Sequence, residues 1–312
     1  MDLFLFANII SDKVLLGKEK WLFDNRFTRY YNGKIKLTDF ELEKAKNNLL
    51  HFREELKKQN IDFILMIAPK NESIYTEYYP YYIKRNLDIN IFDRFVEYMK
   101  KNTDIKIVYP KDELMKYKDK YQLYYPYEHH WNALGGYIAY SELMKLFNIN
   151  VKDLESLNIL SFNYKYRNSS SYYSQTANYV ALSSLEYFKD AKIFVISNFI
   201  SKKTNIMISN VMRWGQNYYY TNEYSTNTNN IYIIRDSMTQ ELLDYIFPSF
   251  NEISVIPYNT FNKFDIIDKK PNIVVFETLE RSFKDRLLNV LPNYKIEEIN
   301  KDLETNFTKA NN

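Results

Sequence analysis

The stretch YYPYEHHWN occupies residues 124–132 and runs directly into the apolar segment ALGGYIAY at residues 133–140. It contains His129 and His130, two of the three histidines in the chain. Histidine takes up and returns a proton near neutral pH, and a carboxylate two residues before His130, that of Glu128, can hold the ring in one tautomer. The stretch therefore predicts a loop that carries a general base and is fixed to the start of a helix.

A second polar turn follows the apolar stretch IYII at residues 231–234. The chain continues through Arg235, Asp236 and Ser237, and a helix-like segment begins at Thr239. A serine between the end of a strand and the start of a helix lies on a sharp turn with outward-pointing backbone N–H groups. We therefore expect Ser237 to be a nucleophile whose turn also supplies an oxyanion hole. Asp236 is expected to hydrogen-bond the local backbone.

Five sequence blocks resemble, in order, those of the SGNH-hydrolase-like O-acetyltransferases of the alginate acetylation type, also called the DHHW family. In that family an Asp-x-His-Trp motif precedes a Gly-Asp-Ser motif. The blocks in this chain are LGKEKWLF (16–23), IAPKNESIY (67–75), EHHW (128–131), RDS (235–237) and PNIVVFETLER (271–281). Each block is short, but the ordered set covers most of the chain and is fairly specific.

The resemblance implies a catalytic triad of Ser237, His130 and Glu128, and an acyl-serine intermediate. In the family a tryptophan follows the catalytic histidine, which selects His130 rather than His129 as the base. Two residues depart from the pattern, since Glu128 stands where the family has Asp and Arg235 where it has Gly. Glutamate is one methylene longer than aspartate. We therefore expect Glu128 to keep the role of orienting His130, while its position relative to the ring differs from that of the family's Asp. Arg235 either holds an anionic group or marks a different turn.

Six residues are candidates for substrate contact. Ligands in open α/β sheets bind beyond the carboxyl ends of strands, which places Lys70 and Asn71, just after a predicted strand, at the site. Asn71 is either an oxyanion donor or a solvated loop residue, and Trp131 either walls the acyl pocket or belongs to the core. Glu280 and Arg281 are expected to form structural ion pairs instead. The six candidates are Lys70, Asn71, Tyr127, His129, Trp131 and Arg235.

The composition excludes several classes of function. The 312 residues include 42 basic and 39 acidic side chains, and a net charge of +3 gives no sign of nucleic-acid binding. The absence of cysteine excludes disulfides, thiolate metal sites and cysteine nucleophiles. We expect no metal, because adjacent histidines rarely direct both rings at one ion, and no cofactor other than an acetyl donor. Thirty tyrosines and 21 phenylalanines suit stacking on sugars, although an AT-rich coding bias is the favoured explanation.

Hydrophobic periodicity predicts an α/β protein. A capping box at Thr38 and Glu41 starts a helix with apolar residues at three- and four-residue spacing, and His51 lies between these positions, on the surface. We expect a three-layer α/β/α sandwich around a mostly parallel sheet, SGNH-hydrolase-like, with a loop-rich insertion. The apolar runs that predict strands lie at 61–68, 105–109, 193–196, 231–234, 253–256 and 273–276.

The predicted organisation is one catalytic domain at residues 38–300, preceded by a lead-in segment at 1–37 and followed by a polar tail at 301–312. Residues 150–230 are expected to form an insertion or flap. Within it, the polar stretch 217–230 lacks periodicity and predicts a surface loop.

The first ten residues are apolar but short, without a basic region or a cleavage site. They predict neither a signal peptide nor a transmembrane helix. The family resemblance nevertheless implies a periplasmic or otherwise extracytoplasmic enzyme, often with an N-terminal anchor.

Three functions remain open. The resemblance favours an O-acetyltransferase that moves an acetyl group through Ser237 to a hydroxyl of a bacterial surface polysaccharide or glycan, with a membrane-bound acyl exporter as partner. A carbohydrate O-acetyl esterase would use the same triad with water as acceptor. A noncatalytic glycan-binding relative is conceivable because of the departures at Glu128 and Arg235.

Overall fold

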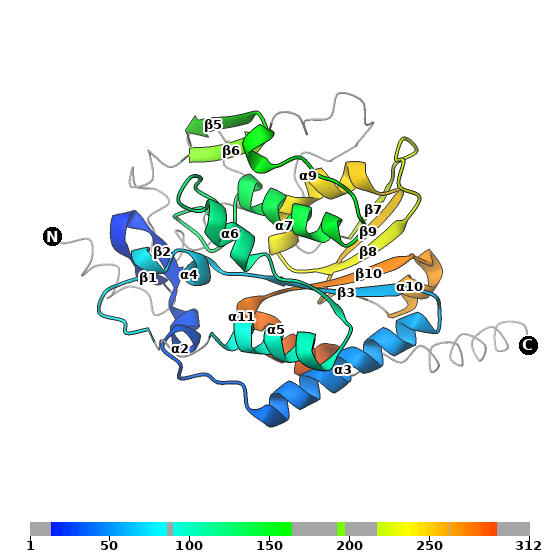
Figure 1. Cartoon of the computed structure of the whole chain (residues 1–312), viewed down its shortest axis with the longest axis horizontal. Coiled ribbons are helices and arrows are strands. Elements are labelled where there is room, and N and C mark those ends of the chain that lie inside the picture. The colour runs from blue at the N-terminus through cyan, green and yellow to red at the C-terminus, as the bar shows by residue number, and fades with distance from the viewer. Residues whose placement is uncertain (1–13, 86–89, 164–191, 197–216, 262, 292–312) are drawn as a thin grey trace, which may run out of the picture.

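A six-stranded sheet forms the centre of the computed structural model, with strand order β4-β3-β10-β8-β9-β7 (Figure 1). Neighbouring strands are parallel except β7, which runs antiparallel to β9. The strands are β3 (Asp62–Ala68), β4 (Lys106–Val108), β7 (Tyr218–Thr221), β8 (Asn230–Arg235), β9 (Glu252–Pro257) and β10 (Ile273–Leu279). The structure describes residues 14–85, 90–163, 192–196, 217–261 and 263–291.

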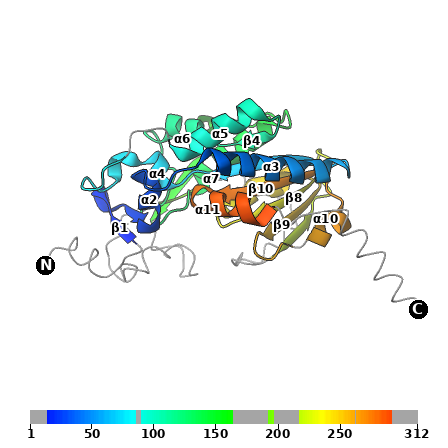
Figure 2. The same cartoon turned by 90° about the horizontal axis from the view of Figure 1, so that it is seen from below.

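Helices cover both faces of this sheet, which confirms the predicted three-layer α/β/α sandwich (Figure 1). One face is covered by α3 (Asp39–Lys57), α5 (Ile91–Asn102), α10 (Lys263–Lys269) and α11 (Glu280–Asp285), which continues into a π-helical turn, Arg286–Val290. The other face is covered by α6 (Lys111–Tyr117), α7 (Ala133–Lys145), the 3-10 helix η9 (Met238–Leu242) and α9 (Leu243–Ile246). Figure 2 shows α3 and α5 lying along the sheet from a second direction.

Strand β3 shows why the apolar runs in the sequence are continuous. Alternate side chains enter opposite cores, with Phe63, Leu65 and Ile67 in the core under α3. Ile64 and Met66 enter the core under α7. A strand covered on both faces has no solvent-facing side, so nearly every position is apolar.

Helix α3 begins as the sequence predicts. The Thr38 side chain accepts a hydrogen bond from the Glu41 N–H, and the Glu41 carboxylate accepts one from the Thr38 N–H. Both bonds satisfy N–H groups that the first helical turn leaves open. His51 is exposed on this helix, as expected.

Two small antiparallel strand pairs, of which the first is a hairpin, flank the main sheet. The first pairs β1 (Val14–Leu16) with β2 (Leu22–Asp24), and it docks on the histidine loop because the Leu22 N–H donates to Pro126 O at 2.7 Å. The second pairs β5 (Ile159–Asn163) with β6 (Lys192–Ile196), so the strand predicted at 193–196 exists outside the central sheet. The remaining short helices are η1 (Lys18–Lys20), η2 (Asn25–Phe27), α2 (Thr28–Tyr31), α4 (Asn71–Ile74), η3 (Thr76–Tyr78), η4 (Leu154–Ser156) and η10 (Phe247–Ser249).

The prediction of a surface loop at 217–230 is wrong for residues 218–221, which form the edge strand β7, and holds for the irregular residues 222–229. Tyrosine and threonine favour strands, and the residues of β7 alternate between half-buried and exposed. The surrounding Asn and Thr residues obscured this short pattern. Segments 164–191 and 197–216 of the predicted insertion, the polar tail at 301–312 and the first ten residues lie outside the described residues. No helix in the described segments has the length and apolar character needed to cross a membrane.

Candidate active site

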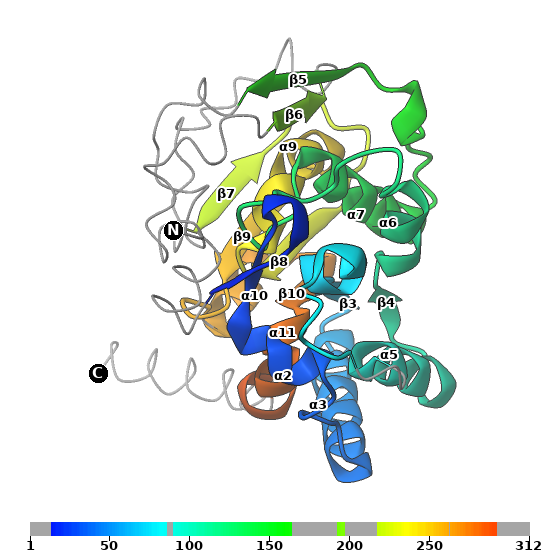
Figure 3. The same ribbon diagram turned by 90° about the vertical axis from the view of Figure 1, so that its left-hand side faces the viewer.

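Ser237 follows β8 at the carboxyl edge of the sheet, the edge that Figure 3 faces. Its Oγ lies 2.7 Å from His130 Nε2, although 107 residues separate the two in the sequence. On the other side of the ring, His130 Nδ1 lies 3.0 Å from Glu128 Oε1. The structure thus brings together the three residues that the sequence singled out, in one hydrogen-bonded line.

The loop that carries His130 is tied to the serine turn by its tryptophan. Trp131 Nε1 donates to Met238 O at 2.8 Å, and the Trp131 side chain is fully buried. Asn132 caps α7, accepting from the N–H groups of Leu134 at 2.9 Å and Gly135 at 3.2 Å. Of the two interpretations of Trp131, the structure therefore favours the core residue, here one that aligns the two loops.

Close packing of α7 against η9 keeps the two loops together. A Cβ atom added at Gly136 would lie 2.5 Å from Glu241 O, far inside van der Waals contact. Only glycine permits this approach without moving the backbone of η9. The helix that follows the histidine loop is thereby held against the helix that follows Ser237.

Hydrogen bonds to the Asp236 carboxylate hold the serine turn in place, as predicted. Asp236 Oδ1 accepts from the Met238 N–H at 2.8 Å, and Oδ2 accepts from the Leu279 N–H at 2.7 Å. Arg286 also donates to Oδ2 at 2.7 Å, which forms a buried ion pair. The arginine is the main reason why the pKa of Asp236 is lowered even though burial acts to raise it.

The sequence did not predict the role of Glu277, which also accepts hydrogen bonds from the serine turn. Glu277 Oε2 accepts from the Asp236 N–H at 2.8 Å and from Thr239 Oγ1 at 2.9 Å. Burial, and then the charge of Asp236, raises the pKa of Glu277 well above its usual range, which favours the neutral acid. A signal was available, because Glu277 is the single charged residue of β10, in which all other residues except Thr278 are apolar.

The two adjacent histidines differ in their electrostatics. Burial alone would lower the pKa of His130, but the Glu128 carboxylate outweighs this effect and raises it. Burial lowers the pKa of His129 well below its usual value, and the neighbouring His130 lowers it further. Their rings lie 4.0 Å apart. His130 is therefore the ring suited to carry a proton, while His129 stays neutral.

Lys70 and Asn71 do not line an open site in this structure, contrary to the expectation from the sequence. Both are fully buried, and Lys70 Nζ lies 3.4 Å from Asp24 Oδ2 and 3.5 Å from Glu72 Oε1. The Asn71 side-chain amide donates to the carbonyl oxygens of Leu22 at 3.2 Å and Glu128 at 3.3 Å. Asn71 thus joins the first hairpin to the histidine loop, and its donors already have acceptors.

The other predicted contact residues are also buried. The Arg235 side chain is fully buried, with its guanidinium 5.5 Å from the centre of the Tyr218 ring. Tyr127 is 1% exposed and His129 is 9% exposed. None of the three offers an exposed surface to a large substrate. Within the described part of the chain, no cluster of three or more acidic or histidine side chains could hold a metal ion.

The expected ion pairs at the end of β10 are half right. Arg281 pairs with Asp24, as predicted. The expectation is wrong for Glu280, whose hydrogen-bond partners are neutral groups: Ser73 Oγ at 2.6 Å, Tyr109 OH at 2.6 Å and the Lys70 N–H at 3.0 Å. Burial raises the pKa of Glu280 to about 7.

Comparison with known families identifies the family of the chain. A family described as "SGNH hydrolase-like domain, acetyltransferase AlgX" matches residues 14–189, which include the first hairpin, α4 and the histidine loop. The chain belongs to this AlgX-type acetyltransferase family. No curated protein matches the chain.

Several solved structures share the fold of this AlgX-type domain. PatB1 from Bacillus cereus has a TM-score of 0.63 at 16% identity, over 90% of this chain and 99% of its own, and has also been solved with a sulfonyl adduct. A DHHW family protein from Eubacterium siraeum has a TM-score of 0.61 at 15% identity, over 91% of this chain and 96% of its own. The O-acetyltransferase domain of Pseudomonas putida AlgJ has a TM-score of 0.53 at 14% identity, over 88% of this chain and 98% of its own.

Proposed function

We propose that the protein is a serine-dependent O-acetyltransferase that moves an acetyl group to a hydroxyl of a bacterial cell-surface polysaccharide. The observation that carries this proposal is the hydrogen-bonded line from Ser237 Oγ through His130 to Glu128. Membership of the AlgX-type acetyltransferase family supports the choice of reaction and of substrate class.

In the first half-reaction, His130 Nε2 accepts the Ser237 proton as Oγ attacks the carbonyl carbon of the acetyl donor. Glu128 accepts a hydrogen bond from Nδ1–H and stabilises the imidazolium. Among the described residues, the Ser237 backbone N–H has no hydrogen-bond acceptor, so it is available to the oxyanion. One such donor is typically worth about 3 kcal/mol in the transition state. The donor's leaving group then departs with the proton from His130.

In the second half-reaction, a hydroxyl of the acceptor sugar gives its proton to His130 and attacks the acetyl-serine. The tetrahedral intermediate collapses, the sugar ester leaves, and Ser237 Oγ regains its proton from the imidazolium. The raised pKa of His130 suits a group that must hold a proton within each half-reaction, from the attack until the tetrahedral intermediate collapses.

The proposal extends to the surroundings of the enzyme. We propose an extracytoplasmic, periplasmic location and a membrane-bound acyl exporter as the source of the acetyl group, with no cofactor besides that donor. The family and the sequence resemblance support both parts.

The test is hydrolysis of p-nitrophenyl acetate with and without candidate oligosaccharides, comparing wild type with Ser237→Ala. Ser156→Ala, at an exposed serine of η4, is the matched control. Acetylated sugar that depends on Ser237 supports transfer. Serine-dependent release of acetate that sugar does not change supports the esterase instead. Turnover equal in wild type and Ser237→Ala contradicts both.

A further inference from the structure

The Ser237 N–H, the oxyanion donor of the proposed reaction, lies between two N–H groups that already have acceptors. The Asp236 N–H donates to Glu277 Oε2 at 2.8 Å, and the Met238 N–H donates to Asp236 Oδ1 at 2.8 Å. The Ser237 N–H itself has no acceptor among the described residues. A donor of this kind contributes to catalysis only if it points at the place where the negative charge develops. The contacts that fix its direction therefore matter for the reaction.

Arg235 holds the other end of the peptide unit to which this N–H belongs. The unit joins Asp236 to Ser237, and Arg235 Nη1 donates to its carbonyl oxygen, Asp236 O, at 3.3 Å. A trans peptide is planar, so its C=O and N–H point in opposite directions, and none of the described peptide bonds is cis. Holding the carbonyl oxygen therefore directs the Ser237 N–H away from the guanidinium.

The guanidinium that holds the carbonyl is itself fixed in place. The Arg235 side chain is 0% exposed, and its Cζ lies 5.5 Å from the centre of the Tyr218 ring. Arg235 ends β8 and Tyr218 begins β7, and both strands pair with β9. The contact thus joins two strands that lie on either side of β9. A buried cation–π contact restrains the guanidinium against rotation into solvent.

The positive charge of Arg235 acts in the same sense as its position. A hydrogen bond from a cation is stronger than one from a neutral donor. When a carbonyl accepts such a bond, the peptide is polarised and its N–H becomes a better donor. Because the charge is buried, water screens it little, and it favours the negative charge that develops at the serine turn.

We propose that Arg235 is a positioning residue of the oxyanion hole, which holds the Asp236 carbonyl so that the Ser237 N–H points at the acetyl oxygen. This role rests on the proposed function and deepens it. It also explains the departure from the family pattern at this position, because glycine has no side chain to make the contact. The guanidinium acts through the peptide unit and needs no contact with the substrate.

The test is steady-state kinetics with p-nitrophenyl acetate on wild type, Arg235→Met, Arg235→Lys and Ser237→Ala. Methionine keeps an unbranched apolar stem but has no donor and no charge, whereas lysine keeps both a donor and the charge. Each rate is divided by the fraction of molecules that phenylmethylsulfonyl fluoride labels at Ser237 when labelling is complete. A partly unfolded variant is then not mistaken for a slow one.

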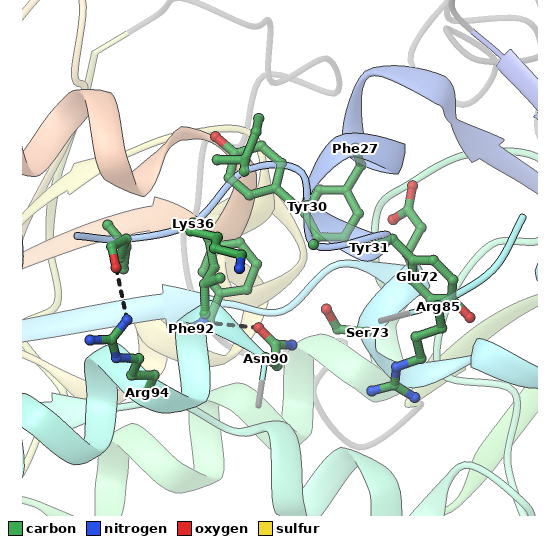
Figure 4. Close-up of a pocket in the computed structure, with 14 residues that line it drawn as sticks. Phe27, Tyr30, Tyr31, Lys36, Glu72, Ser73, Arg85, Asn90, Phe92 and Arg94 are labelled. Atoms are coloured by element: carbon green, nitrogen blue, oxygen red, sulfur yellow. Dashed lines mark hydrogen bonds between the residues drawn. The ribbon is translucent and has the colours of Figure 1, made fainter. Parts of the chain in front are cut away.

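Arg94→Met is the matched control. Arg94 Nη1 also donates to a backbone carbonyl, that of Leu37, at 2.8 Å. It lines a cavity of about 630 Å³ between α2, α4 and the start of α5, and neither Ser237 nor His130 nor Glu128 lines this cavity (Figure 4). The control therefore removes the same charge and the same kind of hydrogen bond at a place apart from the reaction.

We expect Arg235→Met to lower kcat about tenfold or more. KM should stay within about twofold, because acylation and deacylation both pass through an oxyanion and both slow down. Arg235→Lys should recover kcat to within about threefold of wild type, and Arg94→Met should stay within about twofold of it. Tyr218→Leu leaves Arg235 in place but removes the ring that restrains it, and should lower kcat about threefold at unchanged KM. This variant tests the role of Arg235 even if Arg235→Met does not fold.

The outcomes separate this role from the proposed function. Turnover that is equal in wild type and Ser237→Ala would overturn both. Turnover that depends on Ser237 but is unchanged in Arg235→Met, or in Tyr218→Leu where Arg235→Met does not fold, would overturn only the role of Arg235. A change in KM instead of kcat, an Arg235→Lys variant as slow as Arg235→Met, or an equal loss in Arg94→Met would overturn that role as well.

Discussion

The two loops that meet at the candidate active site are held in different ways. The serine turn rests on buried ionisable groups, with Asp236 paired to Arg286 and Glu277 beneath them. The histidine loop is held by neutral hydrogen bonds, from Trp131 to Met238 O and from Asn71 to Glu128 O. Breaking a buried charge pair costs far more free energy than losing a neutral hydrogen bond. The serine turn should therefore control folding, and the histidine loop should control alignment.

The largest effect is expected from Arg286→Leu, which leaves the Asp236 charge buried without its ion-pair partner. We expect the free energy of unfolding to fall by about 3–5 kcal/mol, measured by urea denaturation. Lys106→Leu is the control, because its partner Asp62 is 65% exposed and such surface pairs contribute less than about 1 kcal/mol. Equal losses in the two variants would remove the basis of the comparison.

A pH-dependent effect is expected from Glu280, which anchors α4 from the end of β10. Its pKa is raised from 4.5 to about 7, so the folded state binds this proton more tightly than the unfolded state. The resulting stability is fully present below pH 4.5 and is lost as the pH rises through 7. The loss corresponds to on the order of 3 kcal/mol.

The side chain in Glu280→Gln does not titrate, so comparing this variant with wild type isolates the contribution of Glu280 to the pH dependence of stability. Relative to wild type, the variant should gain stability as the pH rises from 4.5 to above 7, in denaturation curves measured at each pH. A constant difference between the two proteins across this window would show that Glu280 does not titrate there.

A smaller change in stability is expected from Trp131→Phe, which removes the hydrogen bond to Met238 O. The unfolding free energy should fall by about 1 kcal/mol, whereas kcat for p-nitrophenyl acetate should fall about tenfold or more because the two loops lose their alignment. A variant that loses several kcal/mol without losing activity would reverse the roles given to the two loops.

The smallest effect is expected from Glu241→Gln. Glu241 is the weakest of the charges that raise the pKa of His130, and the base form of His130 must be present for attack. In a pH–rate profile, the activity of wild type should rise with a midpoint above the usual pKa of a histidine side chain. The variant should shift this midpoint toward lower pH, and an upward shift would contradict the account.

The sequence predicted the parts of the molecule whose causes are local. The capping box at Thr38 and the continuous apolar run of β3 each follow from neighbouring residues, and the structure confirms both. The meeting of Ser237 with His130 is not local, and its prediction needed the family resemblance as well as the residues.

The missed features depend on tertiary packing. Lys70 and Asn71 follow a strand at the edge where ligands commonly bind, yet Asp24 at the end of β2 and Glu128 in the histidine loop take up their polar groups. The role of Glu277 depends on a turn that β8 places beside β10. No local pattern reveals such partners, although a lone carboxylate in an apolar strand marks a position that needs one.

The central claim is that Ser237 is a nucleophile activated by His130. The most direct measurement is intact-mass and peptide analysis after incubation with phenylmethylsulfonyl fluoride at pH 8, for wild type, Ser237→Ala and His130→Gln. We predict one sulfonyl group on Ser237 in wild type, none in Ser237→Ala, and labelling slowed by about a hundredfold or more in His130→Gln. Labelling at another residue, or equal rates in wild type and His130→Gln, would contradict the claim.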